Sequence, residues 1–342
     1  MRGPAGALRR RTSPPMANQH DVARETGFSQ ATISRALRGD PRVTRDTRAA
    51  VLDACRRLGY RPSVGARMLV RGRAAVIGLS LSDGALRSDR YVSLLHQSLA
   101  LELSNSGWGA ALVTAEDFER QLGEVGALIL VGVSARDPRI AACRAVGVPV
   151  VAIGYPADPT VARVVPDDAD GVRQAILHLA GSAGRERLAL VSSFEASGRD
   201  PGMRLRAEAA REAAAAAGTP LALEVQVRRH VSSALAGYLA VADAPDRFDG
   251  VDGVFCDTDE HAVGVIAALE AAGRSVPGEV SVVGFDDIPG FSAALTTVRQ
   301  DFGALARAAV AFCLDAGDGS GTDPGDRPTS RTVPVRLVVR DT

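Results

Sequence analysis

Hydrophobic and polar positions follow two different patterns along this chain. From His20 to about Leu58, apolar residues recur at the spacing of an amphipathic helix in three short blocks. From Ala74 onward, short apolar runs alternate with Ala-rich stretches of helical length. The first pattern predicts a small all-α domain. The second predicts an α/β fold in which parallel strands and helices alternate in doubly wound layers.

Capping residues indicate where the three N-terminal helices begin and end. The first helix is predicted over 21–26 and ends at Gly27, which can adopt the left-handed conformation that a tight turn requires. Ser29 is suited to cap the second helix and Thr44 the third. Three helices of this size bury little surface, so we expect them to pack around a small core of Val22, Ile33 and Val51.

The apolar runs of the larger region have the lengths of buried strands. The predicted strands cover 76–81, 110–114, 127–131, 148–153, 188–192, 253–256 and 280–285. Helices are predicted between them, including 92–104, 172–180, 203–217 and 262–271. Residues 316–331 are instead polar and rich in glycine and proline, which predicts a surface loop.

Charge is distributed unevenly between the two regions. The first 73 residues contain sixteen arginines and five acidic residues, a net charge of +11. Because the whole chain has a formal net charge of zero, the remainder carries −11. A basic N-terminal region on an acidic body is typical of proteins that present one end to nucleic-acid phosphates, although a merely soluble basic surface is the alternative.

Thiol and imidazole groups do not form a metal or redox motif. The cysteines are widely separated and include no C-x-x-C pair: Cys55, Cys143, Cys256 and Cys313. No run approaches eighteen apolar residues, and the basic N-terminus lacks the apolar segment of a secretory signal. We therefore expect a cytoplasmic, nucleoid-associated protein without a membrane span, metal or cofactor. Residues 1–15 are interpreted as a disordered tail or as an upstream start, with Met16 the true first residue.

The stretch DVARETGFSQATISRAL carries the most specific signal. It places Ala23 where two helices must approach closely, Gly27 in the turn between them and Ile33 under the second helix. A helix-turn-helix has these requirements, and the exposed start of its second helix enters the major groove. Glutamine can pair there with adenine, arginine with guanine and a methyl group with thymine. The exposed candidates are Gln30, Ala31 and Arg35. A helical pair for protein contacts is the alternative.

Taken together, the motifs resemble the LacI/GalR family of repressors from Met16 to Thr342. The matching stretches are DVARETGFSQATISRAL, DPRVTRDTRAAVLDACRRLGYRP, ARML, VSVVGFDDIP, LTTVRQDF and PVRLVVRDT. The resemblance implies a homodimer on a pseudo-palindromic operator, with a two-lobed sensor domain like type I periplasmic binding proteins. The DNA contacts that it implies are Ser29, Gln30, Ala31, Thr32, Ser34, Arg35, Arg38, Arg42 and Arg67.

Residues from Pro62 to Leu69 take the place of the family's hinge helix, which folds only on operator. The resemblance implies that Leu69 enters the minor groove as an apolar wedge and kinks the duplex. Gly65 is a poor helix former, so we expect this hinge to order less readily in the free protein. An ordinary contact between Leu69 and the sensor lobe is the alternative.

The resemblance also places effector contacts in the sensor domain. Asp286, in GFDD, ends a strand at the mouth of the inter-lobe cleft, where its carboxylate can accept two hydroxyl groups. Asp170 and Arg204 are expected to approach from the same lobe, and Phe302 to stack against an apolar ligand face. The alternatives are a strand-end cap for Asp286, surface charges for Asp170 and Arg204, and a core position for Phe302. Weaker candidates are Arg199, Thr258 and Tyr91.

The expected organisation is a tail, a DNA-binding domain, a hinge and an effector-binding and dimerisation domain. Their ranges are 1–15, 16–60, 61–73 and 74–342. Within the last, lobe 1 is predicted over about 74–166 and 298–317, and lobe 2 over about 167–297 and 328–342.

Several positions depart from the family pattern. The segment between Thr114 and Ala127 leaves room only for a stub of helix, which puts part of the dimer surface in doubt. Thr258 stands where an asparagine is expected, and Ala207-Glu208 where glycine and an aromatic residue are expected. The cleft is therefore expected to hold an unusual ligand, or to hold one poorly. We also expect no tetramerisation tail, since the sequence stops at Thr342.

Three functional classes fit parts of the sequence. A ligand-responsive DNA-binding regulator, specifically a repressor with a sugar-like effector, accounts for both regions. A transport-type binding protein would share the sensor fold but leaves 16–60 unexplained. An enzyme is disfavoured, because the chain has no phosphate-binding G-x-x-x-x-G-K-[ST] or G-x-G-x-x-G motif and no nucleophile–base arrangement. The sequence fits both an effector that induces and one that corepresses.

Overall fold

The structure, a computed structural model, describes most of the chain in two compact units, residues 1–70 and 71–342. The described residues are 19–37, 42–58, 76–81, 90–193, 201–227, 233–291, 293–318 and 329–342. The predicted tail and hinge lie outside these ranges, as do four predicted contacts, Arg38, Arg67, Leu69 and Arg199.

The N-terminal unit contains the three predicted helices. They are α1 (Gln19–Thr26), α2 (Gln30–Leu37) and α3 (Arg45–Leu58). Gly27 has a φ of +71° and its N–H donates to the carbonyl of Ala23, so the turn needs the left-handed conformation. The hydroxyl of Ser29 accepts from the N–H of Thr32, and that of Thr44 from the N–H of Thr47. The buried core consists of Val22, Ile33, Ala36, Val51, Ala54 and Cys55.

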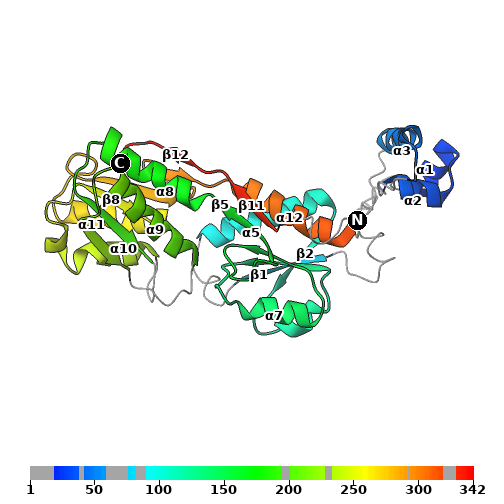
Figure 1. Cartoon of the computed structure of the whole chain (residues 1–342), viewed down its shortest axis with the longest axis horizontal. Helices are drawn as coiled ribbons and strands as arrows, with labels where there is room; N and C mark the ends of the chain where they lie inside the picture. The colour runs from blue at the N-terminus through cyan, green and yellow to red at the C-terminus, as the bar shows by residue number, and fades with distance from the viewer. Residues whose placement is uncertain are drawn as a thin grey trace, which may run out of the picture. The chain divides into compact units, whose positions relative to one another are not determined.

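The first sheet of the larger unit has the strand order β11-β5-β4-β3-β1-β2, and its strand pairs are parallel. Helix α7 lies on one face, and α5 and α12 lie on the other (Figure 1). The strands are β1 (Val76–Leu81), β2 (Gly109–Val113), β3 (Ala127–Val131), β4 (Val150–Ile153), β5 (Ala162–Pro166) and β11 (Ser330–Val333). The helices are α5 (Arg90–Ser106), α6 (Phe118–Leu122), α7 (Pro138–Ala145) and α12 (Phe302–Asp318). The stub of helix predicted before Ala127 is the five-residue α6.

The second sheet has the order β12-β10-β9-β8-β6-β7, with only the β10–β12 pair antiparallel among its described strand pairs. Helices α8 and α9 cover one face, and α10 and α11 the other. The strands are β6 (Leu188–Ser192), β7 (Leu223–Gln226), β8 (Gly253–Cys256), β9 (Ser281–Asp286), β10 (Thr296–Arg299) and β12 (Arg336–Val338). The helices are α8 (Asp168–Leu177) with a π-helical turn His178–Ser182, α9 (Pro201–Ala216), α10 (Ser233–Ala242), a 3-10 turn Pro245–Phe248 and α11 (Asp259–Ala271). The predicted two-lobed, doubly wound α/β fold is confirmed.

Lobe boundaries differ from those predicted at two positions. Strand β10 pairs with β9, so 298–299 belong to the second lobe, and the first lobe resumes at α12. Strand β11 pairs in parallel with β5, so 330–333 belong to the first lobe rather than the second. The prediction missed this because β11 is exposed except at Val333 and has no apolar run. The chain returns to the second sheet only through β12.

The crossings between the lobes determine which edges of the sheets face each other. Strand β5 ends at Pro166 and α8 of the second lobe begins at Asp168, while β10 ends at Arg299 and α12 of the first lobe begins at Phe302. Strand β5 runs parallel to β4, and β10 runs parallel to β9. The carboxyl ends of both sets of parallel strands therefore point toward the opposite lobe, which is where open α/β sheets bind ligands.

Candidate DNA-binding surface and inter-lobe site

The outer face of α2 is polar from its first residue. Ser29, Gln30 and Ala31 are exposed, whereas Ile33 and Ala36 are buried against α1 and α3. The remaining predicted contacts on this helix, Thr32, Ser34 and Arg35, are half-buried, and Arg42 is exposed ahead of α3. The Nε of Arg35 donates to the carbonyl of Ala31 at 3.2 Å, which holds this side chain along the helix. The start of α2 is therefore exposed on the surface of the headpiece, as a recognition helix requires.

The centre of the inter-lobe site is a buried guanidinium. Arg206 on α9 donates from Nε to Asp168 Oδ1 at 2.7 Å and from Nη1 to Asp286 Oδ1 at 3.3 Å. Its Cζ lies 3.6 Å from the centroid of the Phe285 ring. The same Nη1 also donates to the carbonyl of Asp257 at 2.6 Å. Burial alone would lower the pKa of Arg206, but the two carboxylates outweigh it and raise the pKa, so the guanidinium remains charged.

Asp286 reaches this network from an unusual backbone conformation at the end of β9. Its φ is 116° and that of Asp287 is 58°, both in a region that non-glycine residues seldom adopt. The surrounding contacts fix the turn: the carboxylate of Asp287 accepts from Arg299 and Arg340, and Asp259 accepts the N–H of Ile288 at 2.6 Å. Because three side chains hold this strained turn, we infer that the position of the Asp286 carboxylate is important for the site.

Gln300 adds an amide to the same network. Its Nε2 donates to Asp286 Oδ1 at 2.6 Å, and only 3% of the residue is exposed. Its Oε1 is buried and has no hydrogen-bond partner among the residues that the structure describes. A buried acceptor without a donor is costly, so Gln300 Oε1 is an unsatisfied polar atom of this network.

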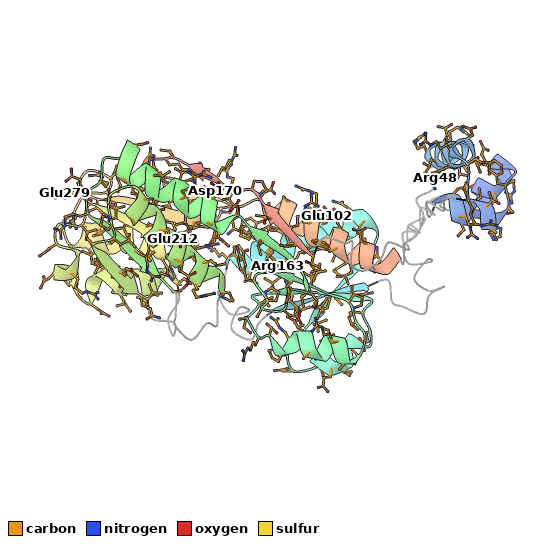
Figure 2. The ribbon with its side chains drawn as sticks, viewed as in Figure 1. Arg48, Glu102, Arg163, Asp170, Glu212 and Glu279 are labelled. Atoms are coloured by element: carbon orange, nitrogen blue, oxygen red, sulfur yellow. The ribbon has the colours of Figure 1, made fainter. Side chains whose placement is uncertain are left out.

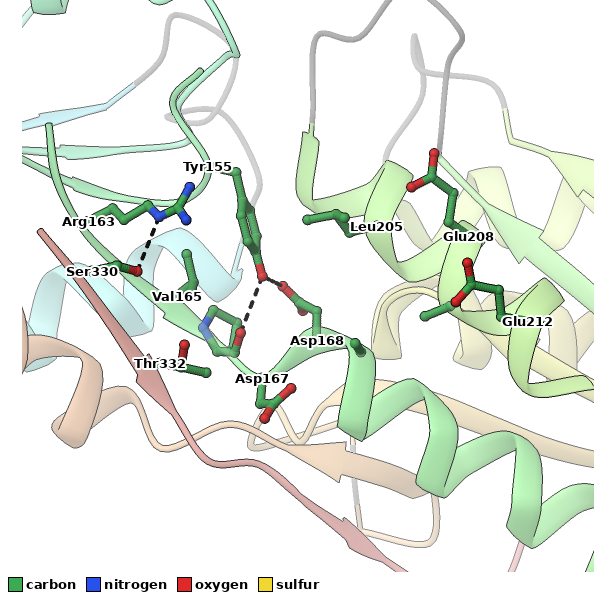
Figure 3. A pocket seen from close by; sticks show the side chains of 13 residues that line it. Tyr155, Arg163, Val165, Asp167, Asp168, Leu205, Glu208, Glu212, Ser330 and Thr332 are labelled. Atoms are coloured by element: carbon green, nitrogen blue, oxygen red, sulfur yellow. Dashed lines mark hydrogen bonds between the residues drawn. The ribbon is translucent and has the colours of Figure 1, made fainter. Parts of the chain in front are cut away.

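The first lobe contacts the network through Tyr155, which follows β4. Its hydroxyl donates to Asp168 Oδ2 at 2.6 Å, and the dashed lines of Figure 3 show this bond beside the contact with the carbonyl of Pro166. Tyr155 and Asp168 also line a side pocket of about 320 Å³ between the lobes. Arg163 on β5 and Glu208 and Glu212 on α9 contribute to its walls. The inter-lobe network is defined here as Tyr155, Asp168, Arg206, Asp286 and Gln300.

A second buried cluster lies next to Arg206 at the end of β8. The Oδ2 of Asp257 accepts from the N–H of Ser193 at 2.7 Å and lies 3.1 Å from the hydroxyl of Ser192, while its Oδ1 lies 2.6 Å from Nδ1 of His261. Burial would raise the pKa of Asp257, but His261 and these hydrogen bonds outweigh it and lower the pKa. The cluster fixes the end of β6 against the end of β8, beside the Arg206 guanidinium.

Two predicted effector contacts do not join this network. Asp170 lies on α8 (Figure 2), where its partly exposed carboxylate pairs with Arg173 and Gln174. Arg204 is exposed and pairs with Glu208 one turn further along α9. The residues found in the network instead stand two positions away, at Asp168 and Arg206. Two residues correspond to about 200° of rotation round a helix, which moves a side chain to the opposite face.

The helical periodicity of buried positions in the sequence would have identified both Asp168 and Arg206. Asp168 shares a buried face with Val172, Ala175 and Leu179, and Arg206 shares one with Ala210 and Ala213. A charged residue at the first position of a buried helical stripe needs a partner at that depth. Two further residues of the network were not predicted: Tyr155, which has no periodic signal, and Gln300, which stands within LTTVRQDF.

The remaining candidates within the described ranges are Tyr91, Phe302 and Thr258. The rings of Tyr91 on α5 and Phe302 on α12 meet edge to face, with centroids 5.4 Å apart, and both residues are half-buried. Thr258 caps α11, because its hydroxyl accepts from the N–H of His261 at 3.2 Å. Arg90 of the first lobe extends over the ring of Phe291 of the second at 4.7 Å, a contact that joins the lobes.

These features define a class of protein: a DNA-binding transcription regulator with a helix-turn-helix headpiece and a periplasmic-binding-protein-like core. The family of bacterial regulatory proteins, lacI family, matches residues 19–63, and the periplasmic binding protein-like domain matches 177–342. An uncharacterized HTH-type transcriptional regulator in the aml 5′ region of Streptomyces limosus is 33% identical over 89% of both chains. AglR of Rhizobium meliloti, also named an HTH-type transcriptional regulator, is 31% identical over 94% of this chain and 93% of its own.

The chain belongs to the LacI family of DNA-binding transcription regulators. Solved structures agree in fold: a CelR–cellobiose complex is 25% identical with a TM-score of 0.68, covering 95% of this chain and 99% of that one. A lac repressor dimer bound to operator and the anti-inducer ONPF is 23% identical with a TM-score of 0.66, over 95% and 98%. These relatives are regulators rather than enzymes. In the described part of the chain, no helix is long and apolar enough to cross a membrane.

Proposed function

We propose that this regulator is a repressor that binds a pseudo-palindromic operator as a homodimer and responds to a sugar or related metabolite bound between its lobes. The observation that carries the proposal is the Arg206 network, a buried polar group located where the carboxyl edges of the two sheets face each other. Carboxylates, an amide oxygen and a tyrosine at such an edge suit a polyhydroxylated ligand. The cellobiose in the similar CelR complex supports this ligand class.

On DNA, the proposal assigns base contacts to the exposed start of α2. Gln30, Ala31 and Arg35 would read base edges, and the other predicted contacts would position the headpiece on phosphate. The net charge of +11 in the first 73 residues supports a phosphate-binding surface. Leu69 would act as the minor-groove wedge of the hinge, a role that stays a prediction.

We propose that the homodimer forms through contacts of the first lobe. Leu101 on α5 is 64% exposed and Leu112 on the edge strand β2 is 48% exposed, although neighbouring residues of both elements pack in the core. Helix α5 and β2 are consecutive elements that pack on each other. Exposed leucines on an edge strand and its helix are costly in a monomer and are covered when a second copy pairs with them.

Operator binding and its release test the proposal directly. The protein is used to select its own sites from genomic fragments, and affinity for the recovered site is measured by fluorescence anisotropy with and without a panel of neutral mono- and disaccharides. A palindromic site bound by two chains, with affinity altered by one of the sugars, is the expected result. Random recovered sequences would contradict the DNA-reading role, and no response to any saccharide would contradict the effector role.

A further inference from the structure

One wall of the side pocket between the lobes is a face of α9. The residues that line the pocket there are three or four positions apart, so they form one stripe along the helix: Leu205, Glu208, Ala209 and Glu212. All four are half-buried or exposed, whereas Arg206, Ala207 and Ala210 of the neighbouring stripe are buried in the second lobe. The lining stripe is called the α9 face, and it lies outside the buried side of its helix.

The opposite wall is a face of the last two strands at one edge of the first sheet. Strands β5 and β11 pair in parallel, with Ser330 opposite Arg163 and Thr332 opposite Val165. Side chains two positions apart on a strand point to the same side, so these four residues form one surface, called the β5–β11 face. All four line the pocket, and residues 166–169 at the crossing between the lobes complete its lining on this side.

The two faces carry opposite charges (Figure 3). Arg163 is the only cation among the residues that line the pocket, and it lies across from Glu208 and Glu212. In the described part of the chain, the side chain of Arg163 has one hydrogen bond, from Nε to Oγ of Ser330 at 3.2 Å. Glu208 pairs with Arg204 on its own helix at 3.3 Å, and the exposed Glu212 has no ion pair with any described residue. Arg163 and Glu212 are therefore both available for a further partner.

We propose that the lobes have a second arrangement in which this pocket closes, the α9 face packs on the β5–β11 face and Arg163 pairs with Glu212. Each face has an apolar side chain, Leu205 and Val165, beside its charge, so closure buries apolar surface and joins opposite charges. The lobes are connected at 166–168 and 299–302, and rotation about such crossings changes the gap between the faces. The proposal goes beyond the proposed function, because it assigns the contact that stabilises a second lobe arrangement rather than the ligand that selects it.

Charge reversal on each face tests the pairing. Arg163→Glu and Glu212→Arg each place like charges on the two faces, so each should disfavour the closed arrangement. The double variant Arg163→Glu/Glu212→Arg restores opposite charges and should close like wild type. Glu186→Arg is the matched control for Glu212→Arg, because Glu186 is an exposed glutamate of the same lobe that does not line the pocket. Combined with Arg163→Glu, it should restore nothing.

The distance between spin labels on the two lobes reports the lobe arrangement. Glu119→Cys on α6 and Asp249→Cys in the second lobe are exposed positions, and the four native cysteines are buried, so the labels attach to the introduced thiols. Labelled full-length chain is diluted into an excess of unlabelled protein, so that each measured pair belongs to one chain. The structure fixes the distance of the open arrangement, and we expect wild type to show a second distance as well. Each single reversal should reduce that second population about twofold or more, and 1 M salt should reduce it in wild type.

Three results would overturn the proposal. The first is a wild-type protein that shows the open distance alone, and the second is a double reversal that stays as open as the single variants. The third is recovery of the closed population in Arg163→Glu/Glu186→Arg, which would assign the effect to net charge. Neither operator nor sugar is present in this experiment. Failure of the proposed function in the operator and saccharide tests would therefore leave the result on lobe closure unchanged, and the reverse also holds.

Discussion

Arg35 is the single side chain from which we expect the clearest effect on DNA reading. It lies in the last turn of α2, where it is half-buried, and its Nε donates to the carbonyl of Ala31. Arg35→Ala should weaken operator binding by about 1–3 kcal/mol and relax specificity at one base pair in each half-site. Anisotropy gives the affinity, and repeated site selection gives the preference at each position.

A matched arginine separates base reading from general charge. Arg56 near the end of α3 is exposed and pairs with Asp53, so Arg56→Ala removes the same charge from another face of the headpiece. This control should leave base preferences unchanged and weaken binding, if at all, evenly across sequences. The assignment of α2 as the reading helix is lost if the preferences of Arg35→Ala equal those of wild type.

Asp286 is expected to be required for the effector response but not for operator binding. Asp286→Asn suits the test, since asparagine tolerates a positive φ better than alanine does and the residue has a φ of 116°. The variant weakens the acceptor that holds Arg206 and Gln300. If the effector is an inducer, effector-free operator affinity should stay near wild type while release by sugar disappears. Normal sugar binding by this variant would remove Asp286 from the site.

Single residues also show where sequence reasoning reached its limit. The GFDD motif located Asp286 correctly at a strand end, but motif spacing on α8 and α9 pointed to Asp170 and Arg204. Those positions face outward, and the buried stripes of the same helices contain Asp168 and Arg206. Similarity to a family motif identifies the segment that carries a site residue. Only the periodicity of the buried positions along the helix determines which side chain of that segment points inward.

At the scale of elements, the contact between α10 and α11 leaves no room for a side chain. A Cβ on Gly264 would lie 2.0 Å from the carbonyl oxygen of Ala234 and 2.6 Å from the N–H nitrogen of Tyr238, both backbone atoms. Gly264→Ala must push the helices apart, so we expect it to lower the free energy of unfolding by about 1–3 kcal/mol or more. Urea unfolding measures the loss. Gly181→Ala, which meets nothing within 4 Å, is the control and should unfold like wild type.

A second prediction at this scale concerns the proposed dimer face on α5 and β2. Leu112→Arg on β2 places a charge on the exposed edge strand, and it should convert the proposed dimer to a monomer because a buried unpaired charge is strongly unfavourable. Light scattering of purified protein reports the mass. Val146→Arg is the comparison, since Val146 is also exposed but follows α7 on the other face of the sheet. A dimeric Leu112→Arg protein would place the interface elsewhere.

Elements were predictable where burial leaves a periodic signal. The continuous apolar runs of β3, β6, β8 and β9 are buried along their length, and the sequence analysis located all four within one or two residues. Strands β7 and β11 are largely exposed and carry no such run, so they were missed. Strands β5 and β10 were missed as well, although they are more buried, because neither has a long apolar run. The missed β11 explains the displaced lobe boundary, because its partner β5 is far away in the sequence.

At the scale of the whole molecule, the proposed function requires that one equilibrium couple the two proposed sites. The lobes meet through Tyr155 and Asp168 and through Arg90 and Phe291, so a ligand that changes these contacts shifts the lobe arrangement. An effector can change operator affinity only by its differential affinity for the two arrangements, typically about 1–3 kcal/mol. Leu69→Ala should weaken specific binding and DNA bending while effector binding to the core stays normal. Wild-type bending by this variant would refute the wedge.

Stability of the core should depend on pH through Asp259, which anchors the turn after Asp286. Burial raises the pKa of Asp259 to about 7, although its hydrogen bonds to Thr297 and the N–H of Ile288 act in the opposite direction. In the unfolded chain an aspartate ionises near pH 4. Between about pH 4 and 7 the unfolded state has therefore lost a proton that the folded state keeps, so the contribution of Asp259 falls as pH rises and is constant above that range.

Asp259→Asn isolates this contribution, because asparagine resembles the protonated acid and does not titrate. The stability of the variant relative to wild type should rise by an amount on the order of a few kcal/mol between pH 4 and 7 and then level off. The difference is the informative quantity, since burial lowers the pKa of His96 and His178 and makes them destabilising as pH falls in the same window. Urea unfolding at a series of pH values measures both proteins. A difference that is independent of pH would show that Asp259 is already ionised in the folded core.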